Sequence, residues 1–179
     1  KTVTSIGNYA FHECSSLTDV KIPESVANIG ESAFDSCSSL NEIIIPDSVV
    51  TIGRYAFSEC KLLKNITIGN SVTSIDYYAF NNCSSLTEIS ISDNISILSG
   101  AVFGGCNKLE SFNFPTSLTQ IGASAFYNCS SLSETDLVIP DGVTSIGGNA
   151  FYGCSTITSI TVPNSVTSIG DGAFKGTNP

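Results

Sequence analysis

A short alternation of apolar and polar residues recurs along the whole chain. Between Leu40 and Pro46, the apolar residues Ile43 and Ile45 alternate with Glu42 and Ile44. Such an alternation is typical of a short strand with one buried face. A proline often follows, and because it lacks an N–H it ends the strand and opens a turn. About seven copies of this alternation predict short strands that stack in parallel.

An Ala-Phe pair repeats with the same period. Aligning the chain on this pair gives a column of phenylalanines at 11, 34, 57, 80, 103, 126, 151 and 174, spaced by 23 residues except for one spacing of 25. A sustained period of this length indicates a solenoid, in which each coil packs only against its neighbours. The two extra residues lie between Leu132 and Ile139, where we expect a bulge or a surface loop. Phe112 and Phe114 are expected to fill core volume in their coil.

The segment before each phenylalanine resembles a helix start. One repeat position is mostly glycine but also accepts Asp76 and Ser99, so it does not require a positive φ. Gly, Asp and Ser are all good helix N-caps. We therefore predict that Gly30 caps a helix of one to two turns over Glu31 to Cys37.

The net charge is −9, and the seven basic residues are scattered along the chain. This balance argues against binding to nucleic acid. No apolar run approaches the roughly 18 residues needed for a membrane span, so we expect no direct membrane insertion.

Seven cysteines occupy one repeat position, three residues after each of the first seven phenylalanines. Zinc sites and disulfide frameworks use close local pairs of cysteines, which are absent here. We expect a column of buried thiols that pack as small hydrophobic groups. Neighbouring thiols would lie near disulfide range, but parallel side chains fit a bridge poorly.

No catalytic constellation is recognisable in the sequence. His12 is the only histidine and is expected at the surface, and neither a nucleophile elbow nor a phosphate-binding loop occurs. A row of carboxylates (Glu24, Asp47, Asp93 and Asp141) follows the strands. It could share Ca²⁺, but Asn70, Thr116 and Asn164 interrupt it. We predict no enzyme activity, no cofactor and no metal site.

The outward positions of the predicted strands are the candidate partner-binding residues. They form an acidic and hydroxyl-rich face with exposed apolar groups, suited to a basic or mixed protein partner; the alternative is a solvated face without a partner. They are Asp19, Lys21, Glu42, Ile44, Asn65, Thr67, Glu88, Ser90, Ser111, Asn113, Glu134, Val138, Ser159 and Thr161. A second, looser group consists of Tyr9, Tyr55, Tyr77, Tyr78, Tyr127 and Tyr152.

The repeat unit C-x-x-L-x-x-[IV]-x-[IV]-P-x-S-V-x-x-I-G-x-x-A-F resembles the BspA-like, or Treponema-type, leucine-rich repeat across essentially the whole chain. The resemblance implies a curved right-handed solenoid with a parallel sheet on its concave side and short helical or 3-10 turns. It also implies a secreted or cell-surface adhesin that binds a host or extracellular-matrix protein, or a glycan, without catalysis.

The chain begins at Lys1 and stops at Pro179 within a repeat, so we expect residues 1–179 to form a single repeat domain from a longer array. We expect a monomer, with end-to-end association as an alternative. The alternative function is a structural spacer that presents other domains.

Overall fold

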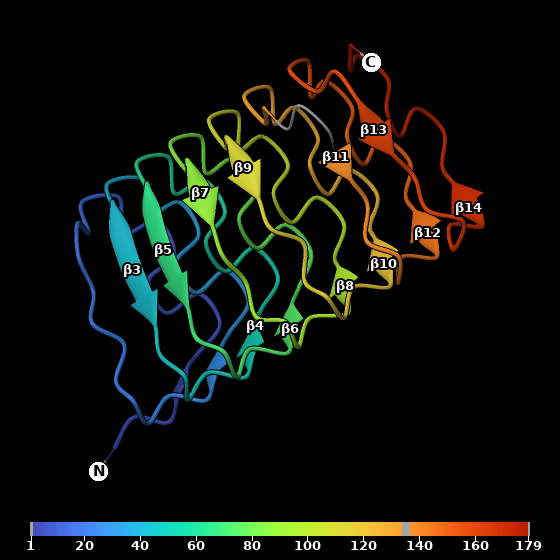
Figure 1. The fold of residues 1–179 in the computed structure, drawn as a ribbon. Helices are drawn as coiled ribbons and strands as arrows, with labels where there is room; N and C mark the ends of the chain where they lie inside the picture. Colours follow the sequence, from blue (N-terminus) through green and yellow to red (C-terminus); the bar gives the residue numbers. More distant parts are fainter. Residues whose placement is uncertain (1, 134–136, 179) are drawn as a thin grey trace.

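The computed structural model describes residues 2–133 and 137–178. Over these residues the chain winds into a solenoid of stacked coils (Figure 1). Equivalent residues of successive coils pair in parallel, for example Ile43 with Ile66 and Ile45 with Ile68, at an offset of one repeat. The predicted solenoid is therefore confirmed. In the described part of the chain, no helix is long and apolar enough to cross a membrane.

The predicted strands lie in one row along the solenoid, here called the front ladder, and form three two-stranded sheets. Buried and exposed residues alternate within it, as in β3, where Ile43 and Ile45 are buried and Glu42 and Ile44 are exposed. Its strands are β3 (Glu42–Ile45), β5 (Asn65–Ile68), β7 (Glu88–Ile89), β9 (Ser111–Phe112), β11 (Leu137–Val138) and β13 (Ile160–Thr161). They pair as β3–β5, β7–β9 and β11–β13, and a bridge between Thr67 and Ser90 joins the first two pairs.

A second ladder, the side ladder, runs along another edge of the solenoid (Figure 1). Its strands are β1 (Ser5–Ile6), β2 (Asn28–Ile29), β4 (Thr51–Ile52), β6 (Ser74–Ile75), β8 (Ile97–Leu98), β10 (Gln120–Ile121), β12 (Ser145–Ile146) and β14 (Ser168–Ile169). They form two four-stranded parallel sheets. The sequence did not predict these strands, because two residues are too few to show an alternation.

The phenylalanine column forms the centre of the core. Neighbouring rings are stacked, with centroids 5.1 Å apart between Phe34 and Phe57 and 5.5 Å between Phe57 and Phe80. The side chains of Phe34 to Phe151 in this column are fully buried. Phe112 adds volume beside the column, 5.2 Å from Phe103 and 4.9 Å from Phe126, as the sequence predicted.

The helix predicted over Glu31 to Cys37 is wrong, because this segment is a run of turns. Ser32 and Ser36 have positive φ angles of 50° and 61°. Every second N–H donates to the next coil rather than along the segment, as Phe34 N does to Ala56 O at 2.8 Å. The turn therefore continues the hydrogen-bonded stacking of the coils, which an α-helix would interrupt because its N–H groups bond within the segment.

The glycine before most of the turns serves close packing, not helix capping. A Cβ atom on Gly53 would lie 2.7 Å from the backbone carbonyl carbon of Gly30 in the preceding coil. Its φ is not in the left-handed region, so the prediction that this position needs no positive φ is confirmed. The column is rich in glycine because neighbouring backbones approach each other closely there.

The cysteines form the predicted column of buried thiols. All seven are free, and all except Cys14, in the first coil, are buried. Each buried thiol also donates a hydrogen bond to a phenylalanine carbonyl of the preceding coil, as Cys83 Sγ does to Phe57 O at 3.1 Å. The thiols thus tie neighbouring coils together as well as filling space.

Candidate binding surface

The described candidate residues lie on one surface, here called the strand face, with their side chains exposed. Parallel, in-register pairing arranges them in two rows along the solenoid. Glu42 is paired with Asn65, and Ile44 with Thr67. Glu88 is paired with Ser111. Adjacent members of a row are about 4.8 Å apart, the spacing of neighbouring strands. The backbone hydrogen bonds fix this array of side chains.

Two adjoining hollows lie on the strand face. The first is lined by Asp19, Lys21, Glu24, Glu42, Ile44, Asn65 and Thr67, together with neighbouring apolar residues. The second is lined by Asn65, Thr67, Asn70, Glu88, Ser90, Ser111 and Asn113, among others. Asn65 and Thr67 belong to both hollows, which therefore form one continuous surface over β3 to β9.

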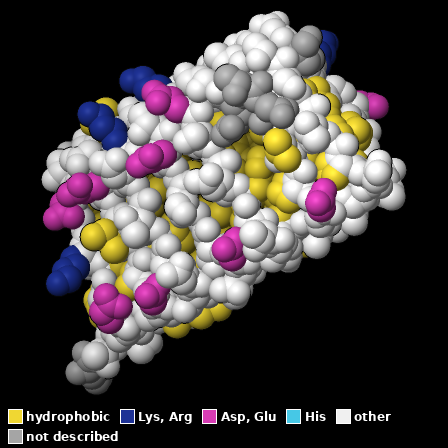
Figure 2. All heavy atoms as spheres, in the orientation of Figure 1, with side chains coloured by type: hydrophobic (Ala, Val, Ile, Leu, Met, Phe, Trp, Pro, Cys, Tyr) yellow, Lys and Arg dark blue, Asp and Glu magenta, His cyan; other side chains and the backbone are white. Residues whose placement is uncertain are grey.

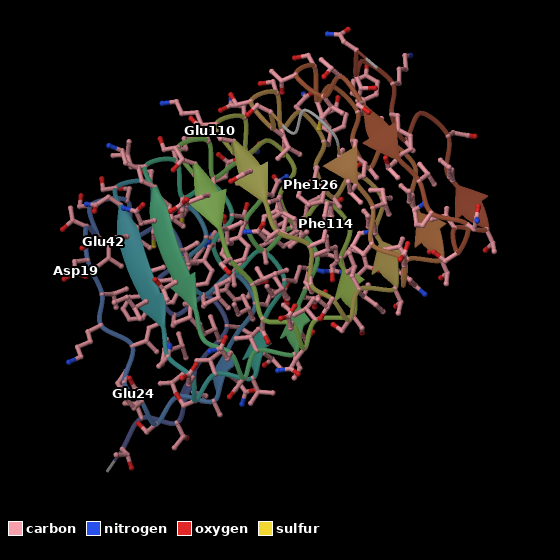
Figure 3. The ribbon with its side chains drawn as sticks, viewed as in Figure 1. Asp19, Glu24, Glu42, Glu110, Phe114 and Phe126 are labelled. Atoms are coloured by element: carbon pink, nitrogen blue, oxygen red, sulfur yellow. The ribbon has the colours of Figure 1, made fainter. Side chains whose placement is uncertain are left out.

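The first hollow combines charge with an apolar centre. The side chain of Ile44 is 68% exposed, and both Glu42 and Lys21 line the same hollow. Figure 3 shows Asp19 and Glu42 beside β3, with Glu24 at the turn below. In Figure 2, acidic and basic side chains both lie around this end of the molecule, and hydrophobic groups reach the surface across the middle of the face. The second hollow is lined mainly by amide and hydroxyl groups.

Some candidate residues are placed differently from the prediction. Asp19 and Lys21 are not in a strand, although the alternating burial continues because Ile22 is buried. Val138 and Thr161 are paired with each other, but neither lines either of these two hollows. Ser159 is also exposed outside the hollows. Glu134 lies outside the described residues, as does most of the predicted bulge.

Glu24 and Asn70 are polar residues that line the hollows and that the strand pattern missed. Both follow the strand and were assigned to the turn. Their position directly after the outward strand residues was the available signal.

The row of carboxylates acts on the backbone of neighbouring coils. Asp47 Oδ1 accepts a hydrogen bond from Asn70 N at 2.7 Å, and Asp93 Oδ1 accepts one from Thr116 N at 2.9 Å. These bonds hold successive turns in register. Within residues 2–133 and 137–178, no group of three or more His, Cys, Asp or Glu side chains could hold a metal ion.

His12 lies near the surface beside Asp35, with Nδ1 at 3.4 Å from Asp35 Oδ2. Partial burial raises the pKa of the Asp35 carboxyl above its ordinary value, and the nearby His12 opposes this shift. His12 Nε2 also lies 3.8 Å from Glu13 Oε1, so the imidazole of His12 lies between two carboxyl groups at the end of the solenoid.

The tyrosines lie on the turns that carry the Ala-Phe pairs, a surface here called the turn face. Tyr55 stacks on Tyr78 with ring centroids 4.8 Å apart, and Tyr127 stacks on Tyr152 at 5.1 Å. Arg54 lies over the ring of Tyr77 at 5.6 Å. As predicted, some tyrosines cover neighbouring coils, but Tyr77, Tyr78 and Tyr127 remain substantially exposed.

Known proteins match this chain in both sequence and structure. A family model of the BspA type leucine-rich repeat region matches six copies over residues 4–133 and 131–179. A leucine-rich repeat protein of T. pallidum is 29% identical, with a TM-score of 0.86, and the match covers 96% of this chain and 80% of that protein. No curated protein matches the chain.

Two further solved structures share the fold. A leucine-rich cell surface protein of Faecalibacterium prausnitzii is 31% identical with a TM-score of 0.66, and the match covers 96% of this chain but 62% of that protein. A leucine-rich repeat protein of Eubacterium ventriosum is 19% identical with a TM-score of 0.58, covering 98% of this chain and 81% of that protein; at this identity the likeness shows the fold alone. From the family match over nearly its whole length, the chain belongs to the BspA-type leucine-rich repeat family.

Proposed function

We propose that this chain is a non-enzymatic protein-binding module of a secreted or cell-surface adhesin, and that its strand face binds a host protein such as one of the extracellular matrix. The observation that carries the proposal is the pair of adjoining hollows, lined by exposed side chains in fixed register over β3 to β9. The similarity to a leucine-rich cell surface protein supports a location at the cell surface.

The chemistry of the first hollow favours a protein partner. Ile44 offers a large apolar group at the centre of charged and polar neighbours, an arrangement common at protein interfaces. Asp19, Glu42 and Glu88 give the strand face an acidic character, which complements a basic segment of a partner. The rigid ladder limits the entropy lost when these side chains are buried on binding.

The test is binding of the purified chain to immobilised fibronectin, fibrinogen and collagen by biolayer interferometry. For a partner that binds, a Glu42→Lys/Glu88→Lys variant should bind on the order of tenfold more weakly, because two charges that complement the partner are reversed. Ile44→Thr, which places the residue of the next coil at this position, should cost a similar factor by removing the apolar contact.

The matched control is Glu13→Lys/Asp171→Lys, which makes the same charge change at exposed positions away from the strand face. Circular dichroism checks that each variant keeps the wild-type fold. Binding by the wild type and the control but not by the strand-face variants supports the proposal. If all variants bind equally, the strand face is not the site. If the wild type binds none of the three proteins, a structural spacer becomes the better description.

A further inference from the structure

A hollow of about 340 Å³ interrupts the tyrosine-bearing turn face. Its floor is a coil that carries the small residues Ala101, Gly104 and Gly105. At the repeat position of Ala101, two earlier coils carry Tyr55 and Tyr78. At the position of Gly104, two later coils carry Tyr127 and Tyr152. The hollow is therefore a gap of one coil between two tyrosine pairs.

The aromatic walls of this hollow are already ordered. Tyr78 and Tyr127 line it and are 37% and 38% exposed. Each ring is backed by a second tyrosine on the side away from the hollow: Tyr55 behind Tyr78 and Tyr152 behind Tyr127. A ligand that stacks on either ring thus meets a side chain whose position is fixed by packing, which lowers the entropic cost of binding.

The polar groups of the hollow are neutral. Asn81, Asn82, Ser124 and Asn128 line it, and no charged residue does, although the chain carries 16 acidic residues. Asn81 Nδ2 donates to Gly104 O at 2.9 Å. Within the described residues, the side chains of Ser124 and Asn128 make no hydrogen bond with the protein. Hydroxyl and amide groups can both donate and accept hydrogen bonds, and these groups line the hollow together with the two tyrosines.

We propose that this hollow binds a neutral saccharide, with one pyranose ring between Tyr78 and Tyr127. A pyranose ring has apolar C–H faces that pack on aromatic side chains, and a rim of hydroxyl groups that pair with amides and hydroxyls. The lining carries no positive charge, and the carboxylate of Glu59 lies beside it, where Oε1 accepts a hydrogen bond from Asn82 Nδ2; both features disfavour an anion. This site lies on the turn face and is separate from the strand-face site proposed above.

The test is isothermal titration calorimetry of the whole chain with maltotetraose, cellotetraose and N-acetylchitotetraose, and with sorbitol as a polyol that has no ring. We expect one of the tetrasaccharides to bind with a stoichiometry of one and a Kd on the order of 1 mM. Sorbitol should not bind. Tyr127→Ser introduces the residue type that Ser58 has at the same repeat position. It should weaken binding about tenfold because it removes one of the two aromatic walls of the hollow.

Ala101→Tyr provides the complementary variant. Tyr55 and Tyr78 occupy the same repeat position with positive φ angles of 54° and 61°, close to the 53° of Ala101. The new ring should therefore continue the stack, fill the hollow and abolish binding. Tyr9→Ser is the control for the loss of a tyrosine in Tyr127→Ser. Tyr9 lies on the same turn face, at the repeat position of Tyr78 and Ala101, but does not line the hollow, and Ser32 is the residue at its position one coil further on.

Loss of binding in Tyr127→Ser and Ala101→Tyr, with unchanged binding in Tyr9→Ser, supports the proposal. The proposal is overturned if no tetrasaccharide binds, if sorbitol binds equally well, or if Tyr127→Ser binds as tightly as the wild type. Circular dichroism monitors folding, and if Ala101→Tyr does not fold, Tyr127→Ser decides alone. Because the residues differ from those of the strand face, this result is independent of the matrix-protein experiment.

Discussion

Raising the pH from 7 to 10 should lower the free energy of unfolding by about 8 kcal/mol through the buried cysteines alone. Burial raises the pKa of Cys37 to about 11 and the pKa values of Cys106 and Cys154 to about 12. It also raises the pKa values of Cys60, Cys83 and Cys129 far above the ordinary value of 9.0. At pH 10 these six thiols therefore stay protonated in the folded chain.

The direction of this effect follows from proton linkage. In the unfolded chain the same thiols lose their protons above pH 9, so the unfolded state becomes more stable as the pH rises. Each thiol contributes about 1.4 kcal/mol at pH 10. The stabilisation is fully present below the unfolded pKa and is lost between pH 9 and the folded pKa. Since native domains are stable by about 5–15 kcal/mol, the solenoid should be close to unfolding at pH 10.

Urea denaturation followed by circular dichroism, at pH values from 7 to 10 and with a reducing agent present, measures this loss. Cys106→Ala is the control, because it removes one titrating group from the interior. At pH 7 the variant should have a lower free energy of unfolding than the wild type. At pH 10 the difference between the two free energies should be about 1.4 kcal/mol smaller, because only the wild type loses the contribution of this thiol. A difference that stays constant across this range would contradict the assignment of the effect to the thiols.

Phe80→Ala should destabilise the solenoid by about 3–5 kcal/mol, the usual cost of emptying a buried aromatic site. Phe80 is fully buried and stacks on Phe57 at 5.5 Å and on Phe103 at 5.8 Å. The substitution would leave a cavity between stacked coils. The hydrogen-bonded ladders on either side would keep these coils from moving together to fill it. Urea denaturation at pH 7 gives the loss directly.

Phe174→Ala is the matched comparison for this experiment. Phe174 is only partly buried and stacks on a single ring of the phenylalanine column, Phe151, at 5.5 Å. Its removal should cost clearly less than the removal of Phe80. If the two variants lost the same free energy of unfolding, the contribution of a phenylalanine in this column would not depend on how deeply it is buried or on how many rings it stacks against.

The periodic features of the fold were predictable because each coil repeats them. The alternation of Ile43 and Ile45 and the column of Phe34, Phe57 and Phe80 recur often enough to indicate buried faces without a structure. The helix at Glu31 was predicted wrongly because capping residues favour turns as well as helices. What decides between them is hydrogen bonding to the next coil, for example from Phe34 N to Ala56 O. No local pattern reports this bond.

The candidate surface was predictable in part for the same reason. Strand alternation placed Glu42, Ile44 and Thr67 on one exposed face, and the structure groups them in a hollow. Alternation could not show that Glu24, after the strand, joins this hollow, because that depends on how the turn folds back. The hollow between Tyr78 and Tyr127 was also missed. It depends on which residues are small in one coil, a departure from the repeat rather than a part of it.

The most direct test of the strand face as a binding surface is a bead-adhesion assay on a surface of the matrix protein that binds best. The beads are coated at equal density with either the wild-type chain or the Glu42→Lys/Glu88→Lys variant. Both coatings have the same length and shape, so a spacer function would be identical for the two. We predict that wild-type beads adhere and that variant beads detach at much lower shear. Equal adhesion of the two kinds of bead would contradict the assignment of binding to the strand face.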